Sequence, residues 1–129
     1  MSAKRILLID DNPAIVRLMS VVIGRQGFAV TTARNGAEAL IKIRESRPDL
    51  IVTDYDMPEM NGLAFIEEFR QQPNSGIPVI FLSGDSDPAN IEAARMAGAD
   101  LCLCKPFSHE ELTRHIRELL DASATEKEQ

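Results

Sequence analysis

Four short polar segments carry the residues best suited to chemistry. Asp10-Asp11, Asp54, Ser83-Gly84 and Lys105 each follow directly after a short apolar run. An aspartate can act as a nucleophile or as a ligand for a hard cation. A serine hydroxyl and a lysine ammonium can both hydrogen-bond an anion. We therefore ask which elements would bring these four segments together.

The apolar runs have the length and composition of buried strands. Most are rich in Val, Ile and Leu, as expected for strands covered on both faces of a parallel sheet. The predicted strands cover residues 5–9, 28–33, 50–53, 77–82 and 101–104.

Amphipathic segments with readable caps lie between the runs. The first helix is expected to begin at Pro13 behind an Asn12 cap and to end before Gly27. A second covers about 37–45, a third includes 63–69, a fourth follows Asp87, and a fifth opens with the capping box 108–111. The first helix has an apolar stripe that should face the core, formed by Ile15, Leu18, Met19, Val22 and Ile23.

Five successive βα units predict a single-domain α/β fold with a doubly wound, five-stranded parallel sheet. We expect the flavodoxin-like (βα)5 arrangement with strand order 2-1-3-4-5. At 129 residues the chain is too short for an eight-fold barrel. The domain should cover residues 4–122, with 123–129 as a polar C-terminal tail or linker.

In such a sheet the polar segments meet at one edge, beyond the carboxyl ends of the strands. Strands 1 and 3 are neighbours in this order, so Asp10, Asp11 and Asp54 converge, with Ser83 and Lys105 beside them. Two like charges about 4 Å apart repel by about 4 kcal/mol at an effective dielectric near 20. One lysine cannot offset that fully, whereas Mg²⁺ prefers a few carboxylates together with a phosphate oxygen. The pattern predicts a site for a cation and a phosphoryl group.

Other noticeable residues have simpler interpretations. Asn61-Gly62 is predicted to form a turn and helix start, and His109 and His115 are assigned structural or surface roles. Cys102 and Cys104 are two apart in a strand, which places them poorly for a disulfide and supplies too few ligands for a zinc site. The sequence contains no G-x-S-x-G, no H-E-x-x-H and no Gly-rich phosphate loop.

Taken together, these segments resemble the receiver domain of bacterial two-component response regulators, including the chemotaxis regulators. The resemblance covers about residues 4 to 122. It rests on "DD" at 10–11, "DYDMPEMNG" at 54–62, "SG" at 83–84 and "KPF" at 105–107.

The resemblance implies that the protein is a phosphorylatable switch. Asp54 would accept a phosphoryl group from a histidine kinase or phosphotransfer protein, and the domain would catalyse its own phosphorylation and dephosphorylation. The implied Mg²⁺ ligands are Asp10, Asp11, Asp54 and the backbone carbonyl of Asp56.

The resemblance also implies how the signal leaves the site. Ser83 and Lys105 would bind phosphoryl oxygens, and the Lys105–Pro106 peptide bond would be cis. The face made by the fourth helix, fifth strand and fifth helix would carry the output to a downstream partner.

Two features depart from the family pattern or add to it. Many receivers have an aromatic residue three positions before the lysine, and here that position is Cys102, so the step from Ser83 to the output face needs other side chains. Asp56 and Asp85 add carboxylates beside the site. We hypothesise that they change the lifetime of the phosphoryl group.

Two alternatives differ in class. A degenerate receiver would act only as a protein-binding module, although the intact acidic triad argues against it. The "DYD" at 54–56 also resembles the D-x-D of haloacid-dehalogenase-type phosphatases, but that motif is expected after a first strand.

Bulk properties limit the partners. The net charge of −6 argues against direct contact with nucleic acid. No apolar run approaches a membrane span. We expect a cytoplasmic monomer or weak dimer. The chain is compatible with a complete protein or with one domain of a longer one.

Overall fold

The computed structural model describes residues 3–55, 57, 60–73, 75–84 and 87–128. The strands are β1 (Arg5–Ile9), β2 (Ala29–Ala33), β3 (Leu50–Asp54), β4 (Val79–Ser83) and β5 (Leu101–Cys104). The helices are α1 (Pro13–Gly24), α2 (Gly36–Glu45), α3 (Gly62–Arg70), α4 (Pro88–Ala97) and α5 (His109–Glu128).

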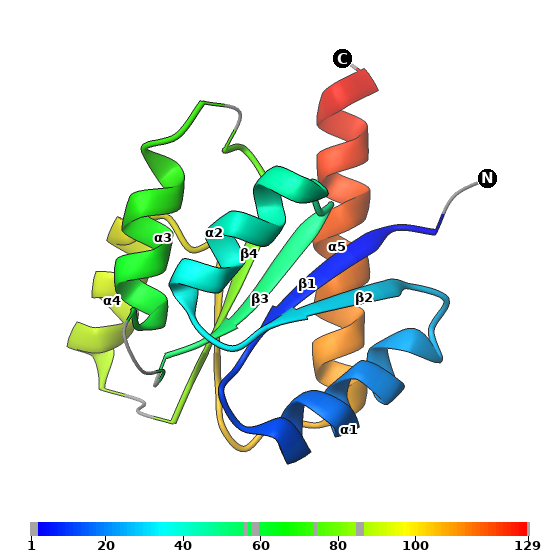
Figure 1. Ribbon diagram of the computed structural model, residues 1–129, viewed down its shortest axis with the longest axis horizontal. Coiled ribbons are helices and arrows are strands. Elements are labelled where there is room, and N and C mark those ends of the chain that lie inside the picture. The colour runs from blue at the N-terminus through cyan, green and yellow to red at the C-terminus, as the bar shows by residue number, and fades with distance from the viewer. Residues whose placement is uncertain (1–2, 56, 58–59, 74, 85–86, 129) are drawn as a thin grey trace.

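The five strands form one parallel sheet in the order β2-β1-β3-β4-β5, which confirms the predicted topology (Figure 1). Leu8 of β1 lies between Thr32 of β2 and Val52 of β3. Asp54, the last residue of β3, lies opposite Leu82 of β4. Because the strands are parallel, Asp54 and Ser83 at the ends of β3 and β4 lie at the same edge of the sheet as the residues that follow β1 and β5.

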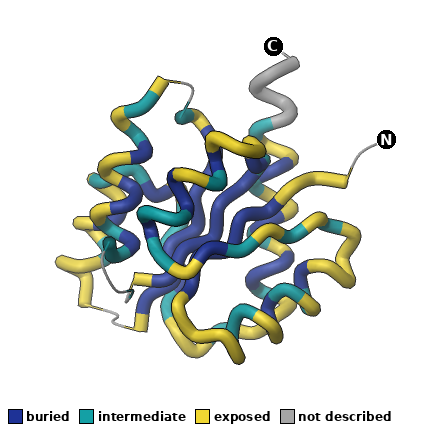
Figure 2. Tube along the Cα trace, viewed as in Figure 1, coloured by how far each residue is buried: buried dark blue, intermediate teal, exposed yellow. Residues whose placement is uncertain are grey.

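Helices cover both faces of the sheet. One core cluster joins the sheet to α2, α3 and α4, and the other joins it to α1 and α5. Every residue of β3 and β4 is buried, so these central strands carry the apolar runs as expected (Figure 2). The edge strand β2 alternates between exposed and partly covered residues before the buried Ala33, because successive side chains point to opposite faces of the sheet.

The predicted helix caps are confirmed. The Asn12 side chain accepts hydrogen bonds from the backbone N–H groups of Ala14 and Ile15 at the start of α1. Asp87 caps α4 in the same way, through Ala89. At the start of α5 the Ser108 hydroxyl accepts from the backbone N–H of Glu111, so this half of the capping box is present.

The prediction that Leu18 faces the core is wrong. Its residue surface is 53 % exposed, whereas Met19 and Ile23 of the same helix are buried. Successive residues of a helix are rotated by about 100°. Met19 and Ile23, four residues apart, therefore point at the sheet, and Leu18 lies to the side of that face.

The last helix is longer than expected. α5 continues to Glu128, so helix covers most of the segment expected as a polar tail, and its end extends beyond the sheet (Figure 1). No helix in the described part of the chain is both long and apolar enough to cross a membrane.

Candidate functional site

Three carboxylates meet at the carboxyl ends of β1 and β3. Asp10 and Asp11 follow β1 and Asp54 ends β3, and one oxygen from each lies within 4.8 Å of the others. Asp10 is 2 % exposed and Asp54 is 7 % exposed, while Asp11 is open to solvent. The predicted convergence of these three residues is confirmed. Such a set of hard oxygen donors, open on one side, fits a divalent cation that keeps several waters.

A lysine from the neighbouring part of the sheet reaches into this cluster. The Lys105 Nζ donates a hydrogen bond of 2.8 Å to Asp54 Oδ1 and forms an ion pair with it. The Lys105 backbone N–H donates to the carbonyl of Ser83, which anchors the end of β5 to the end of β4. The Lys105–Pro106 peptide bond is cis, as the resemblance implied.

The electrostatics of the cluster centre on Asp10. Burial raises the pKa of its carboxyl above the ordinary value, and the charge of Asp54 adds to that rise. The backbone N–H of Asn12, which donates to Asp10 Oδ1 at 2.9 Å, and the Lys105 ammonium both oppose the rise. When the three carboxylates are ionised, the single Lys105 ammonium does not neutralise their charge.

Ser83 lies where the sequence placed it. It is 6 % exposed and ends β4, one residue beyond Leu82, the register partner of Asp54. Its hydroxyl is therefore on the strand adjacent to the acidic cluster. Asp56 and Asp85 lie outside the described residues, so their predicted roles stay predictions.

Gly62 is closer to the site than the sequence interpretation implied. It begins α3, as expected for Asn61-Gly62, and its N–H donates to the carbonyl of Tyr55. A Cβ atom at Gly62 would lie 2.3 Å from the backbone oxygen of Asp54. The residue must be glycine because α3 begins directly against the backbone of Asp54. No local signal distinguishes this close approach from an ordinary turn.

Cys102 occupies the position that is aromatic in many receivers. Its Sγ lies 3.7 Å from the carbonyl oxygen of Ile91 in α4, a distance suited to a weak thiol hydrogen bond. Burial raises the pKa of the Cys102 thiol, the nearby Cys104 adds to the rise and Arg95 opposes it. Cys102 therefore packs as a small, neutral side chain between β5 and α4.

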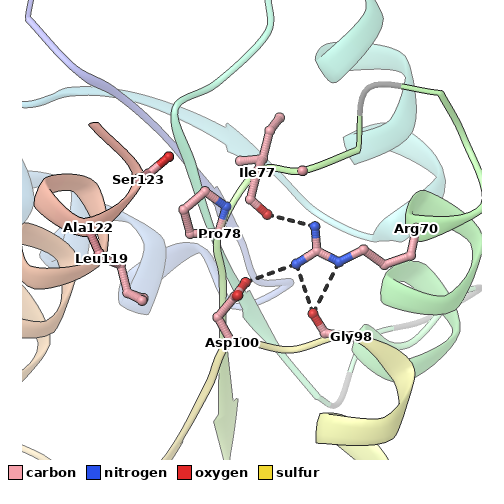
Figure 3. A pocket seen from close by; sticks show the side chains of 9 residues that line it. Arg70, Ile77, Pro78, Gly98, Asp100, Leu119, Ala122 and Ser123 are labelled. Atoms are coloured by element: carbon pink, nitrogen blue, oxygen red, sulfur yellow. Dashed lines mark hydrogen bonds and ion pairs between the residues drawn. The ribbon is translucent and has the colours of Figure 1, made fainter. Parts of the chain in front are cut away.

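A cavity of about 340 Å³ lies away from the acidic cluster, at the opposite edge of the sheet. Figure 3 shows the residues that line it. The Arg70 guanidinium lines it and hydrogen-bonds the carbonyl oxygens of Gly98, Ile77 and Ser75 and the Asp100 carboxylate. These bonds occupy all five N–H groups of the arginine. Arg70 therefore has a structural role, and the sequence interpretation missed it because its partners are 5 to 30 residues away.

The edge at Asp54 is the one arranged for chemistry. It combines a buried carboxylate that can act as a nucleophile, a carboxylate cluster that could hold a cation and a lysine that can hold an anion. Metal coordination and phosphoryl transfer both match this donor set. At the cavity beside Arg70, the guanidinium is already fully used by its structural hydrogen bonds.

Comparison with known proteins agrees with this geometry. Residues 6–117 match the response regulator receiver domain family. The chain is 33 % identical over 114 residues to the DNA-binding response regulator MtrA of Mycolicibacterium smegmatis, covering 88 % of this chain and 49 % of that protein. The chain thus spans about half the length of the curated relatives it matches.

Solved structures are similar over nearly the whole chain. A CheY-like response regulator receiver domain protein from Methanospirillum hungatei has a TM-score of 0.89 and 31 % identity, covering 97 % of this chain and 99 % of that one. The signal receiver domain of a histidine kinase from Syntrophus aciditrophicus has a TM-score of 0.87 and 35 % identity, covering 93 % of this chain and 92 % of that one.

Family match, fold and site agree, and the chain belongs to the response regulator receiver domain family, the signalling module of two-component systems.

Proposed function

We propose that this receiver is a phosphorylatable switch whose acceptor is Asp54. The observation that carries the proposal is the Asp54 carboxylate itself, which is 7 % exposed, paired with Lys105 at 2.8 Å and adjacent to Asp10 and Asp11. The donor is a phosphohistidine of a histidine kinase or phosphotransfer protein. Receiver domains interact with such kinases and with downstream effectors.

In the transfer step an Asp54 carboxylate oxygen forms a bond to phosphorus, and the phosphorus–nitrogen bond to the histidine breaks. The imidazole leaves with the electron pair, and Asp54 becomes an aspartyl phosphate. Lys105 exchanges its contact with Asp54 for a phosphoryl oxygen, and the Ser83 hydroxyl donates to another. Mg²⁺, when bound, supplies positive charge that offsets the oxygens of the transferring group.

Asp10, Asp11 and Asp54 are the side chains that would hold Mg²⁺. Their carboxylate oxygens suit this hard cation, and the net negative charge of the cluster favours any divalent ion over none. The backbone carbonyl of Asp56 stays a predicted further ligand. The hypothesis that the Asp56 and Asp85 carboxylates change the phosphoryl lifetime, by orienting or repelling water, stays a prediction.

The output would be carried by the face that α4, β5 and α5 form. Cys102 on β5 contacts the carbonyl of Ile91 in α4, which provides a direct link between two of the three elements. A thiol cannot swing as an aromatic ring does. We infer that the signal instead passes through the strands, from Ser83 to its register partner Cys104.

The context of the domain follows from its relatives. MtrA is described as DNA-binding, and this chain matches about half of it. The net charge of −6 supports the proposal that residues 4–122 act through protein partners and do not contact DNA themselves. The cytoplasmic location, the monomer or weak dimer and the division into a domain at 4–122 and a separate segment at 123–129 stay predictions.

Mass spectrometry after incubation with acetyl phosphate and Mg²⁺ tests the acceptor. Wild type should gain one phosphoryl mass, and the Asp54→Asn variant should gain none. Asp49→Asn is a matched control directly before the start of β3, because the amide keeps an oxygen for the Arg5 N–H. A wild type that gains no mass would instead support the binding-module alternative, and rapid turnover of many phosphate esters would support a phosphatase.

A further inference from the structure

A mainly apolar cavity of about 280 Å³ opens beside the acidic cluster. Its polar end is formed by Asp10 and Lys105, and His109 also lines it. Its apolar walls come from α1, from β4 and from the loop that follows β5, and they consist of Ile15, Leu18, Met19, Leu82, Pro106 and Phe107.

The cavity is continuous with the phosphoryl site. Asp10 and Lys105 belong to both, whereas Asp54 does not line the cavity among the residues that the structure describes. In an in-line displacement the leaving oxygen lies on the far side of phosphorus from the attacking oxygen. A group that leaves during attack by Asp54 therefore lies away from Asp54, and the cavity, which shares Asp10 and Lys105 with the site, offers it an apolar surface.

We propose that this cavity binds the hydrocarbon part of small acyl phosphates, so that the domain is phosphorylated faster by donors with a short apolar chain than by acetyl phosphate. This inference rests on the proposed function of Asp54. The Asp54 oxygen bonds to phosphorus, the bond between phosphorus and the acyl oxygen breaks, and the acyl group leaves as a carboxylate. No proton is needed, and the Lys105 ammonium at the polar end of the cavity favours the departing negative charge.

The size of the cavity supports a donor longer than acetyl phosphate. At roughly 30 Å³ per water, the space holds about nine waters, so a single methyl group leaves most of it unfilled. Full burial of one methylene strengthens binding by about fourfold. Butyryl phosphate has two more methylenes, and half-covering them in this open cavity predicts a gain of about fourfold.

The experiment compares the second-order rate constants for phosphorylation of the full chain by acetyl and butyryl phosphate with Mg²⁺. Acetate and butyrate are carboxylates of nearly equal basicity, so the two donors have matched intrinsic reactivity. The readout is the butyryl-to-acetyl ratio, followed by phosphoryl mass against time. We expect a ratio of about four in wild type.

Two variants of α1 test whether the cavity causes the difference. Leu18 lines the cavity and is 53 % exposed, so Leu18→Gln should fold and should lower the ratio to about one. Val21 is 46 % exposed on the same helix but lies outside the lining, and Val21→Gln should keep the wild-type ratio.

The outcomes separate the two proposals. A wild-type ratio of one or less, or a ratio unchanged by Leu18→Gln, overturns the cavity proposal while phosphorylation by acetyl phosphate still supports the Asp54 switch. If neither donor adds a phosphoryl mass, the proposed function fails and the cavity proposal fails with it.

Discussion

Asp10 is the most buried of the three carboxylates. Its ionisation links the site to the free energy of unfolding. Its raised pKa means that the folded protein holds the proton more tightly than the unfolded chain does. Asp10 therefore favours the folded state below the unfolded pKa, and that contribution is lost as the pH rises through the folded pKa. Above that folded pKa the carboxylate is ionised, and the Asn12 N–H and the Lys105 ammonium offset its charge only in part, so without a cation it destabilises the fold.

We expect Asp10→Asn to increase the free energy of unfolding at pH 7 in the absence of Mg²⁺. The amide keeps an oxygen for the Asn12 N–H and removes the repulsion from Asp54, a gain of about 1–3 kcal/mol. The gain should shrink as the pH falls through the raised pKa of Asp10. Urea denaturation of both proteins at several pH values measures the difference.

Glu92→Gln is the charge-matched control, because Glu92 is an exposed residue of α4 paired only weakly with Arg95. It should change the free energy of unfolding by less than about 0.5 kcal/mol at either pH. A stabilisation by Asp10→Asn that is absent, or that grows as the pH falls, would contradict this account of the site.

Among the elements, α3 and α4 are held at their carboxyl ends by Arg70. Its side chain, 22 % exposed, bridges the ends of both helices to the starts of β4 and β5 through Ile77 and Asp100. Asp100 Oδ2 also accepts the backbone N–H of Val79 at 2.7 Å. Gly98 has a φ of 121°, and a Cβ there would lie 2.7 Å from the Arg70 side chain. The glycine therefore ends α4 and leaves space for the arginine.

Arg70→Lys should lower the free energy of unfolding by about 2–3 kcal/mol, because an ammonium cannot span three carbonyls and a carboxylate. Phosphorylation of Asp54 by acetyl phosphate should persist, since Arg70 lies at the other edge of the sheet. Chemical denaturation measures the first effect, and mass spectrometry measures the second.

Arg95→Lys in α4 is the matched control for Arg70→Lys. Arg95 is 66 % exposed and forms an ion pair with Glu92 of the same helix, at 3.6 Å. Its substitution should cost less than about 0.5 kcal/mol. Equal losses in the two variants would show that Arg70 does not act as a clamp.

At the scale of the whole molecule, cation binding at the sheet edge should stabilise the entire fold. The ligands Asp10, Asp11 and Asp54 come from β1 and β3 and are brought together only in the folded chain. A ligand that binds only the folded state adds RT ln(1 + [L]/Kd) to its stability.

Mg²⁺ at about ten times its Kd should therefore raise the free energy of unfolding by about 1.4 kcal/mol. Thermal or urea denaturation with MgCl2, against KCl of equal ionic strength, measures the gain. Asp11→Asn should lose most of it and Asp49→Asn should keep it. The same gain with K⁺ would mean that the carboxylates bind no specific cation.

Much of this molecule is readable from local patterns. The runs at 5–9, 50–53 and 101–104 are short and apolar, so they could satisfy their backbone groups and cover both faces only as strands of a parallel sheet. Once that sheet is assumed, Asp10, Asp54 and Lys105 must meet, because the carboxyl ends of its strands share an edge. Fold and cluster therefore followed from residue types, spacing and strand order.

The tertiary structure alone decided the features that depend on contact between distant segments. Helical period could not tell Leu18 from Met19, since the side of α1 that meets the sheet is set by packing. The need for glycine at 62 arises from the Asp54 carbonyl, and Arg70 finds partners up to 30 residues away. The cavity beside Lys105 needs three separate elements to enclose it. Sequence determined which groups reach the edge of the sheet, because periodicity and caps act locally, whereas the folded chain decided what surrounds them.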